Sequence, residues 1–367
     1  MSDKVKVLIV DDSSFMRSIL ARMMQKDGRF EVVGQAKDGQ EGVELSHSLK
    51  PDVITMDIEM PRMTGIEALK VIMKDNPTPV VMVSSLTKEG AQATLDAMDY
   101  GAVDFIAKAM DEGAGNSLLS KSAVFMEKVY AASKARMVRR LSRPSTVGVK
   151  PKLDAPSVPA STSSVVPSIR KSLPKSKLMN TKLLLIGSST GGPRALQDVV
   201  PQLPDTIKFP VVIAQHMPGH FTGPMADRLN QVSKTTVVEG KDGDVLENGV
   251  VYIAPGGLHT RVITKDGKLV LSVKEDTGNE CVYKPSVDIL SNSAAVSVGG
   301  QVLALMLTGM GNDGAKGFQD IKNKGGYILA QDESTSIVYG MPKAVAPFAD
   351  EVLTLEEIIP VIKRLVC

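Results

Sequence analysis

The stretch LLLIGSSTGG, residues 183–192, decides the fold of the second half of this chain. Its apolar residues predict a buried strand, and the small residues that follow them predict a sharp turn. Pro193 comes next, and proline is favoured in the first turn of a helix. A glycine-rich turn that carries serine between a strand and a helix can present a nucleophile or bind a phosphate. The residues at the ends of the other strands must decide between these two uses.

The same alternation of strand and helix recurs along the chain. Short apolar runs separated by stretches long enough for helices indicate parallel sheets covered on both faces. In the first half we expect strands at residues 5–10, 30–36, 52–57, 79–84 and 103–106, and a last helix over about 117–141. In the second half we expect strands at residues 182–187, 210–216, 250–254, 301–307 and 327–330, with a hairpin across Asp266-Gly267. The sequence therefore predicts two doubly wound α/β/α domains, the second with a mostly parallel sheet and a small antiparallel hairpin.

A segment rich in proline and serine separates the two halves. Residues 142–178 contain prolines at 144, 151, 156, 159, 167 and 174 and show no helical or strand period. This composition is typical of a semi-extended linker. A chain of 367 residues is also too long for one ordinary core. We expect a first domain over residues 1–125, a helix end and linker over 126–179, and a second domain over 180–367.

The composition favours a cytoplasmic protein with no nucleic-acid partner. The 43 lysines and arginines nearly balance the 41 aspartates and glutamates, so no overall field attracts nucleic acid or a membrane surface. The two cysteines, Cys281 and Cys367, offer neither a disulfide framework nor the spacing of metal ligands. The chain start does not have the pattern of a leader peptide, and no apolar run reaches about 18 residues, so we expect no direct membrane insertion.

Five chemically matched residues follow strands of the first domain. Asp11 and Asp12 follow the first strand, and Asp57 ends the third. Ser84 ends the fourth strand, and Lys108 follows the fifth. In an open parallel sheet these strand ends meet at one edge, where three carboxylates repel one another unless a cation such as Mg²⁺ joins them. Each aspartate taken alone is better explained as a cap or turn residue. Together the five residues fit phosphoryl transfer to Asp57, with the metal and Lys108 neutralising phosphate charge.

These five residues and the segment MDIEMPRMTG at 56–65 resemble the response-regulator receiver family. The resemblance implies a flavodoxin-like domain in which Asp57 accepts the phosphoryl group and shares Mg²⁺ with the acidic pair before it. It also implies that Ser84 and Lys108 sense the phosphate. One departure is Ala109, because receivers usually carry proline directly after the lysine.

The glycine-rich turn of the second domain does not fit a phosphate site. Gly187 and Gly192 have the separation found in phosphate loops, but Pro193-Arg194 stands where Lys-Ser/Thr would reach the phosphates. A dinucleotide fingerprint also fails, because Ser189 occupies the position of its second glycine. The spacing of Gly187, Ser189 and Gly191 instead matches a nucleophile elbow, which exposes a serine hydroxyl on a turn from strand to helix.

A nucleophilic serine needs a base, and His216 is the best candidate. This histidine ends an apolar run at residues 211–215, so it emerges at the same sheet edge as Ser189 and within plausible reach of it. The other three histidines have weaker placements. They are His47, His220 and His259.

The base in turn needs an acid to orient it, and Asp313 lies where such an acid is expected. It belongs to the run TGMGNDG at 308–314, which follows a predicted strand. The glycines of this run allow backbone N–H groups to form an oxyanion hole around Met310. The chain order Ser, His, Asp differs from the Ser, Asp, His order of α/β-hydrolases, so we expect a triad on a different fold.

Along essentially its whole length, the chain resembles the CheB family of chemotaxis response regulator protein-glutamate methylesterases. The resemblance lies in residues 186–192, 215–218, 221–222, 254–256, 285–288 and 308–314. It implies that Ser189, His216 and Asp313 form a catalytic triad. It also implies that Thr190 and the methionine of the last motif lie near the oxyanion or substrate. A small departure is Ser188, where alanine is common in the family.

The resemblance to the CheB family implies a serine hydrolase regulated by phosphorylation. It would demethylate glutamate γ-methyl esters on the cytoplasmic helices of methyl-accepting chemoreceptors, and some members deamidate glutamines there. A histidine kinase would be the phosphodonor, Mg²⁺ would serve receiver phosphorylation, and ester hydrolysis would need no cofactor. We also expect the unphosphorylated receiver to cover Ser189 and phosphorylation to relieve this cover. Phe105 stands at the receiver's aromatic switch position, although an aromatic residue there is often simply core.

Two other classes of protein compete with the enzyme. A receiver joined to a DNA-binding domain would need a basic helix-turn-helix, whereas the second half is rich in strands with glycine turns at their ends. A non-catalytic adaptor would keep the fold only to bind receptors or kinase, and the intact set of serine, histidine and aspartate argues against it.

Overall fold

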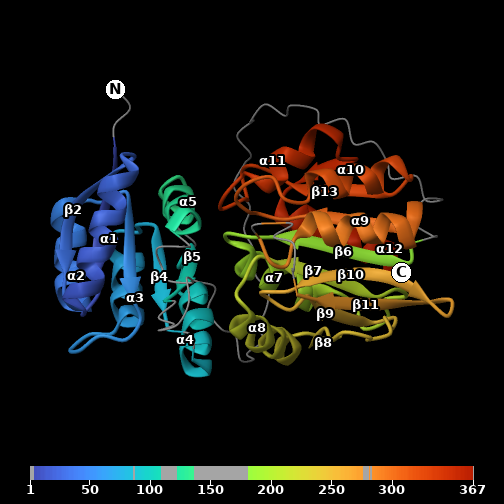
Figure 1. Cartoon of the computed structure of the whole chain (residues 1–367), viewed down its shortest axis with the longest axis horizontal. Coiled ribbons are helices and arrows are strands. Elements are labelled where there is room, and N and C mark those ends of the chain that lie inside the picture. Colours follow the sequence, from blue (N-terminus) through green and yellow to red (C-terminus); the bar gives the residue numbers. More distant parts are fainter. Residues whose placement is uncertain are drawn as a thin grey trace, which may run out of the picture.

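The computed structural model describes residues 4–85, 87–108, 122–135, 181–275, 281 and 283–366. Two α/β units lie side by side, an N-terminal unit up to residue 135 and a C-terminal unit from residue 181 (Figure 1). The linker prolines and Ala109 lie outside the described residues. Helix α5, Ser122–Ser133, crosses residue 125 and packs on the N-terminal unit. Within the described part of the chain, no helix is long and apolar enough to cross a membrane.

The N-terminal unit is a parallel sheet in the order β2-β1-β3-β4-β5. This is the flavodoxin-like order, which confirms the predicted fold. Its strands are β1 Val5–Val10, β2 Phe30–Ala36, β3 Val53–Asp57, β4 Val80–Ser84 and β5 Asp104–Ala107. Its helices are α1 Ser14–Asp27, α2 Gly39–Leu49, α3 Gly65–Asp75, α4 Lys88–Asp99 and α5. Strands β3 and β4 are buried at every position because helices cover both faces of the sheet centre.

Local sequence signals start the helices close to the carboxyl ends of the strands. Ser13 caps α1 by accepting a hydrogen bond from Met16 N at 3.3 Å. Thr64 caps α3 in a capping box with Glu67, whose carboxylate accepts from Thr64 N at 2.9 Å. Thr87 caps α4. These early caps keep the strand-to-helix loops short, which holds the carboxylates of the loops at one edge.

The C-terminal unit is a parallel sheet in the order β14-β13-β12-β6-β7-β9-β8, with a separate hairpin of β10 and β11. Its strands are β6 Leu183–Ser188, β7 Val211–Gln215, β8 Thr236–Glu239, β9 Val250–Ile253, β10 His259–Lys265, β11 Lys268–Lys274, β12 Val302–Met306, β13 Tyr327–Gln331 and β14 Glu351–Leu353. Its helices are α7 Gly192–Val199, α8 Gly219–Val232, α9 Val287–Ser297, α10 Ala315–Asn323, α11 Met341–Val345 and α12 Leu355–Val366, with 3-10 turns at Val200–Gln202, Gly299–Gln301 and Ala346–Phe348. The predicted mostly parallel sheet and hairpin are confirmed.

The strand order of the C-terminal sheet reverses beside β6. From β6 the chain first builds β7, β8 and β9 on one side, and then β12, β13 and β14 on the other. In open α/β sheets, ligands bind outside the carboxyl ends of the strands at such a switch point. The turn after β6 and the loops after β7 and β12 meet there.

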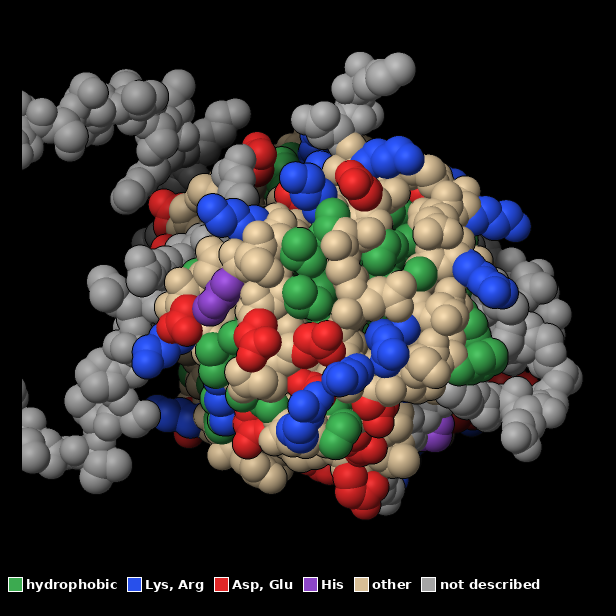
Figure 2. Space-filling view, turned by 90° about the vertical axis from the view of Figure 1, so that its left-hand side faces the viewer, with side chains coloured by type: hydrophobic (Ala, Val, Ile, Leu, Met, Phe, Trp, Pro, Cys, Tyr) green, Lys and Arg blue, Asp and Glu red, His purple; other side chains and the backbone are tan. Residues whose placement is uncertain are grey.

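The two units share a packed interface. Helix α4 of the N-terminal unit contacts α8 and α7 of the C-terminal unit, and the Phe105 and Phe221 rings meet with centroids 4.5 Å apart. A buried apolar cluster that includes both rings continues from one unit into the other. The opposite, outer face of the N-terminal unit carries acidic and basic side chains interspersed with apolar ones (Figure 2). The apolar joining surface therefore lies at β5 and α4.

Candidate active site

The Ser189 turn is held by the strands on both sides of β6. Ser189 N donates to Thr308 O at 3.1 Å, and His216 N donates to Ser188 O at 3.1 Å. Gly191 then adopts the left-handed conformation, with φ at +77°, and α7 begins. The serine is 3% exposed. The predicted strand, turn and helix are therefore present, with Ser189 at the switch point of the sheet.

The loop after β12 passes so close to Ser189 that it needs glycine. A Cβ atom placed on Gly309 would lie 2.9 Å from the Cβ of Ser189, closer than such atoms approach in proteins. Gly309 N also donates to Val338 O at 3.0 Å, which fixes the loop from its other side. Met310 follows directly and is buried. The loop thus brings its backbone beside the serine, where the sequence predicted an oxyanion site around Met310.

His216 and Asp313 meet as a hydrogen-bonded pair. His216 Nε2 lies 2.7 Å from Asp313 Oδ2, and both residues are buried. With the ring proton on Nε2, the free lone pair is on Nδ1, which is buried and makes no hydrogen bond to the described residues. The structure therefore forms the acid–base half of the predicted triad. The bond from His216 to Ser189 is not formed in this arrangement.

The N-terminus of α9 holds Asp313 in its ionised form. Ser286 Oγ donates to Asp313 Oδ1 at 2.9 Å, Val287 N donates to Oδ2 at 2.7 Å, and Asp288 N donates to Oδ1 at 3.0 Å. Burial acts to raise the pKa of Asp313, but hydrogen bonds from His216 and the two backbone N–H groups outweigh it and lower the pKa. Asp313 is thus a permanently charged partner for the histidine.

A tyrosine that the sequence did not single out covers one face of the histidine ring. Tyr283 stacks on His216 with ring centroids 4.4 Å apart and an interplanar angle of 1°. Burial, followed by the charges of Asp313 and Glu127, raises the pKa of Tyr283, so its hydroxyl stays neutral. Tyr283 lies in a loop without helical or strand period, and therefore no spacing signal marked it.

The hydroxyl of Thr190 is bound by the N-terminal unit. Thr190 Oγ1 donates to Asp104 Oδ2 at 2.5 Å. The other oxygen of Asp104 accepts from Lys128 Nζ at 3.0 Å, which fixes the carboxylate. The sequence placed Thr190 near the oxyanion but did not identify Asp104, because the two residues lie in different domains. In this arrangement a carboxylate lies beside the proposed catalytic serine.

A second hydroxyl beside the nucleophile points into the protein. Ser188 Oγ donates to Gln215 Oε1 at 2.7 Å. Gln215 Nε2 in turn donates to the backbone oxygens of Ser189, at 3.0 Å, and His216, at 3.1 Å. Ser188 is fully buried. It therefore supports the turn and does not compete with Ser189 as a nucleophile.

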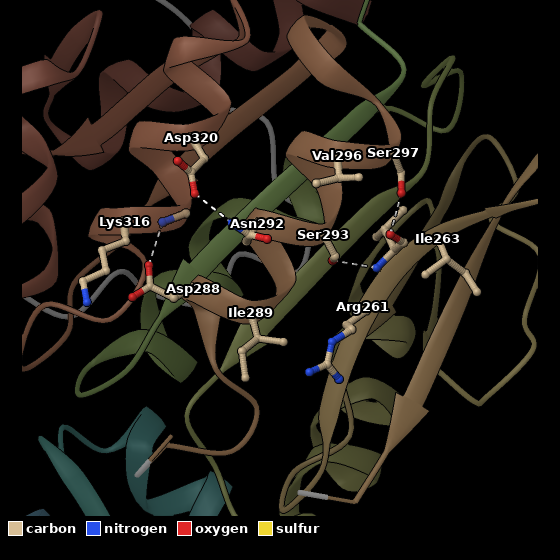
Figure 3. A pocket seen from close by; sticks show the side chains of 12 residues that line it. Arg261, Ile263, Asp288, Ile289, Asn292, Ser293, Val296, Ser297, Lys316 and Asp320 are labelled. Carbon is tan, nitrogen blue, oxygen red and sulfur yellow. Dashed lines mark hydrogen bonds between the residues drawn. The ribbon is translucent and has the colours of Figure 1, made fainter. Parts of the chain in front are cut away.

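The groove drawn in Figure 3 lies behind this site, between α9, α10 and β10. Its lining includes Asp288, whose Oδ1 accepts a hydrogen bond from Gly317 N at 2.8 Å at the start of α10. Burial chiefly, and the charge of Asp313, raise the pKa of Asp288. Neither Ser189 nor His216 lines the groove. Asp288 therefore joins α9 to α10 behind the catalytic acid.

The acidic edge of the N-terminal unit gathers the predicted metal ligands. One ligand oxygen from each of Asp11, Asp12 and Asp57 lies within 4.8 Å of the others. Lys108 Nζ lies 2.7 Å from Asp57 Oδ2 and 3.0 Å from Asp11 Oδ2. Burial chiefly, and the Asp11 charge, raise the pKa of Asp57 despite Lys108. The pKa of Lys108 is raised too, because these carboxylates outweigh its burial. One ammonium does not balance three carboxylates, and an all-oxygen set of this charge fits Mg²⁺.

Ser84 lies at the end of β4, but its hydroxyl is engaged by α4. Thr94 Oγ1 donates to Ser84 Oγ at 2.7 Å, and Ser84 Oγ lies 3.2 Å from the carbonyl oxygen of Gly90. Among the described residues, Ser84 makes no hydrogen bond to Asp57. The side chain that was predicted to sense phosphate is thus connected to the helix that contacts the C-terminal unit.

Comparison with known proteins shows similarity over both units. Residues 184–362 match the family model described as CheB methylesterase, and residues 7–119 match that of the response regulator receiver domain. A protein of Lawsonia intracellularis (strain PHE/MN1-00), named protein-glutamate methylesterase/protein-glutamine glutaminase, is 43% identical over 96% of this chain and 97% of its own length. A protein of Oleidesulfovibrio alaskensis with the same name and the number 1 is 44% identical over 96% of this chain and 97% of its own length.

Two solved structures from Thermotoga maritima are similar to the separate units. The CheB methylesterase catalytic domain is 41% identical, with a TM-score of 0.48, and the match covers 50% of this chain and 98% of that chain. The CheB response regulator domain is 49% identical, with a TM-score of 0.34, and the match covers 36% of this chain and 99% of that chain.

Proposed function

The chain belongs to the CheB methylesterase family and carries a response regulator receiver domain, and from this premise we propose how its residues act. The enzyme is a protein-glutamate methylesterase of sensory adaptation in chemotaxis, regulated by phosphorylation. Its substrates are glutamate γ-methyl esters on the cytoplasmic helices of chemoreceptors, and the protein works in the cytoplasm. The observation that carries the proposal is the buried His216–Asp313 pair, 2.7 Å apart, beside the Ser189 turn.

In the first step Ser189 attacks the ester carbonyl. Its Oγ forms a bond to the carbonyl carbon while its proton passes to Nδ1 of His216. The imidazolium that results is stabilised by Asp313, which stays ionised because its pKa is lowered. The loop carrying Met310 and the start of α7 at Thr190 supply donors for the oxyanion. His216 then returns the proton to the departing methoxide, and methanol leaves.

In the second step water resolves the acyl-enzyme. His216 accepts a proton from the water, the new oxygen bonds to the acyl carbon, and the bond to Ser189 breaks with return of the proton. A glutamate carboxylate is the product. The same acyl-enzyme forms from a glutamine side chain with loss of ammonia, so we extend the proposal to deamidation. The relatives' name also includes glutaminase.

The receiver would take a phosphoryl group at Asp57 from a histidine kinase. Asp11, Asp12 and Asp57 would hold Mg²⁺, which neutralises phosphate charge when bound. The Lys108 ammonium already contacts two of these carboxylates and would pair with the phosphate. We propose no cofactor for ester hydrolysis, because the steps above use only side chains and backbone donors.

Regulation follows from where the receiver lies. Asp104 occupies the hydroxyl of Thr190 next to the nucleophile, and α4 covers α7 and α8. A substrate helix cannot reach Ser189 while these contacts persist. Ser84 connects the phosphorylation edge to α4 through Thr94, so a phosphate at Asp57 has a physical route to this interface.

The test of the activity is methanol release from methylated receptor membranes. Ser189→Ala should lower the rate by at least about 10³-fold, because the covalent step is lost. Ser188→Ala is the matched control, since its hydroxyl supports the turn only, and it should retain most of the activity. If folded, phosphorylated wild-type protein releases no methanol, a non-catalytic adaptor explains the chain better.

A further inference from the structure

The receiver covers the surface that a substrate must use. Helices α7 and α8 follow the strands that end in Ser189 and His216, and α4 packs on both helices (Figure 1). A protein substrate that delivers a side chain to Ser189 must therefore enter the space that α4 now fills. The contacts made by α4 show what this surface of the catalytic domain can bind.

The polar part of this contact is one arginine facing two carboxylates. Arg228 Nη1 lies 2.5 Å from Asp96 Oδ1, and Arg228 Nη2 pairs with Asp99. Arg228 is on α8, whereas both aspartates are on α4, three residues apart and so on one face of that helix. The guanidinium offers its donors as a fork, which suits oxygen acceptors of this kind. The surface thus receives an α-helix that carries acidic side chains.

The substrate of the proposed reaction has the same chemistry. Each ester that is cleaved leaves a glutamate on a helix, so a helix with more than one such site presents carboxylates beside its remaining esters. A helix of this kind and α4 share a backbone form, a charge and a required place on the enzyme.

We propose that Arg228 binds a carboxylate of the receptor helix, and that α4 occupies this place as an internal mimic of that helix until phosphorylation. This inference rests on the proposed function and names the residue that recognises the substrate. Arg228 therefore has two successive partners, Asp96 and Asp99 in the resting protein and an acidic receptor side chain in the active one.

The experiment compares two variants of the full chain that break the same ion pairs from opposite sides. Arg228→Gln removes the cation, and Asp96→Asn with Asp99→Asn removes the anions. Without a phosphodonor, both should raise methanol release from receptor membranes by about 2–5-fold, because partly exposed pairs contribute modestly. With acetyl phosphate and Mg²⁺, the double aspartate variant should match wild type. Arg228→Gln should show a KM about tenfold higher with kcat within about twofold, the pattern of lost ground-state binding.

Three results decide the proposal. Arg228→Lys, which keeps the charge but not the fork, should recover part of the lost KM and shows that a folded variant is being measured. If phosphorylated Arg228→Gln has the same KM as the double aspartate variant, Arg228 serves only the resting contact and the proposal is wrong. If phosphorylated wild type releases no methanol at all, the proposed function itself has failed, which is a different result.

Discussion

At the residue scale, His216 is held from two directions. Asp313 bonds its Nε2 atom, and the ring of Tyr283 lies flat against one face. A base that must take a proton from Ser189 and return it to the leaving group gains from a ring that cannot tilt. The Tyr283 hydroxyl is not needed for this role, since the stack involves the ring.

The stack predicts different results for two substitutions of Tyr283. Tyr283→Phe keeps the ring, so kcat for methanol release should stay within about threefold of wild type. Tyr283→Leu removes the aromatic contact, which contributes about 0.5–1.5 kcal/mol in such pairs, so kcat should fall by about 2–12-fold with KM little changed. Equal kcat values for the two variants would show that stacking does not position His216.

Single residues also show where sequence reasoning ended. Ser189, His216 and Asp313 could be predicted because each follows an apolar strand, and strand ends of a parallel sheet converge. Asp104 and Tyr283 could not. Asp104 begins its strand in another domain, 86 residues before its partner Thr190, and only the packed interface brings them together.

At the element scale, helix α9 acts through its first turn. Its N-cap Ser286 accepts a hydrogen bond from Ile289 N at 3.3 Å and donates to Asp313. Two backbone N–H groups of the same turn also bind this carboxylate. A helix N-terminus favours negative charge, so α9 both carries a cap and stabilises the catalytic acid.

The lowered pKa of Asp313 predicts a pH-dependent effect of Ser286→Ala. A depressed pKa stabilises the fold above the unfolded value of about 3.9, and this stabilisation is lost as pH falls through the folded pKa. At pH 7 the substitution should lower the free energy of unfolding by about 2–3 kcal/mol, through a charged hydrogen bond and a cap. Urea unfolding should show a smaller loss at pH 3.

A double-mutant cycle separates the two parts of this loss. With Asp313→Asn in the background there is no carboxylate to stabilise, so Ser286→Ala should cost only the cap, about 1 kcal/mol, at either pH. A penalty that is the same in both backgrounds and at both pH values would contradict the role given to α9.

Elements differ in how well sequence predicted them. Strands β1, β2, β6 and β12 lie where apolar or alternating runs predicted them, within one residue at each end. Strands β8 and β14 were missed because both are short edge strands that contain charged residues and lack a continuous apolar run. Their pairing depends on neighbours that are distant in sequence.

At the scale of the whole molecule, the two chemical sites lie at opposite ends of β5. Lys108 follows the strand at the acidic edge, whereas Asp104 begins it and contacts the catalytic domain. Four strand residues span roughly 13 Å, so a phosphate on Asp57 does not touch the Asp104 contact. The signal must pass through packed elements, and β5 and α4 are the two that join the receiver to the catalytic domain.

The most direct test of a serine esterase under receiver control is methanol release by the full chain with and without acetyl phosphate and Mg²⁺. Wild type should accelerate when both are added and should stay at its resting rate when a chelator removes the metal. Asp57→Asn should stay at the resting rate under all conditions, and Ser189→Ala should release no methanol above background. A wild-type rate that is equal with and without the phosphodonor would contradict the account.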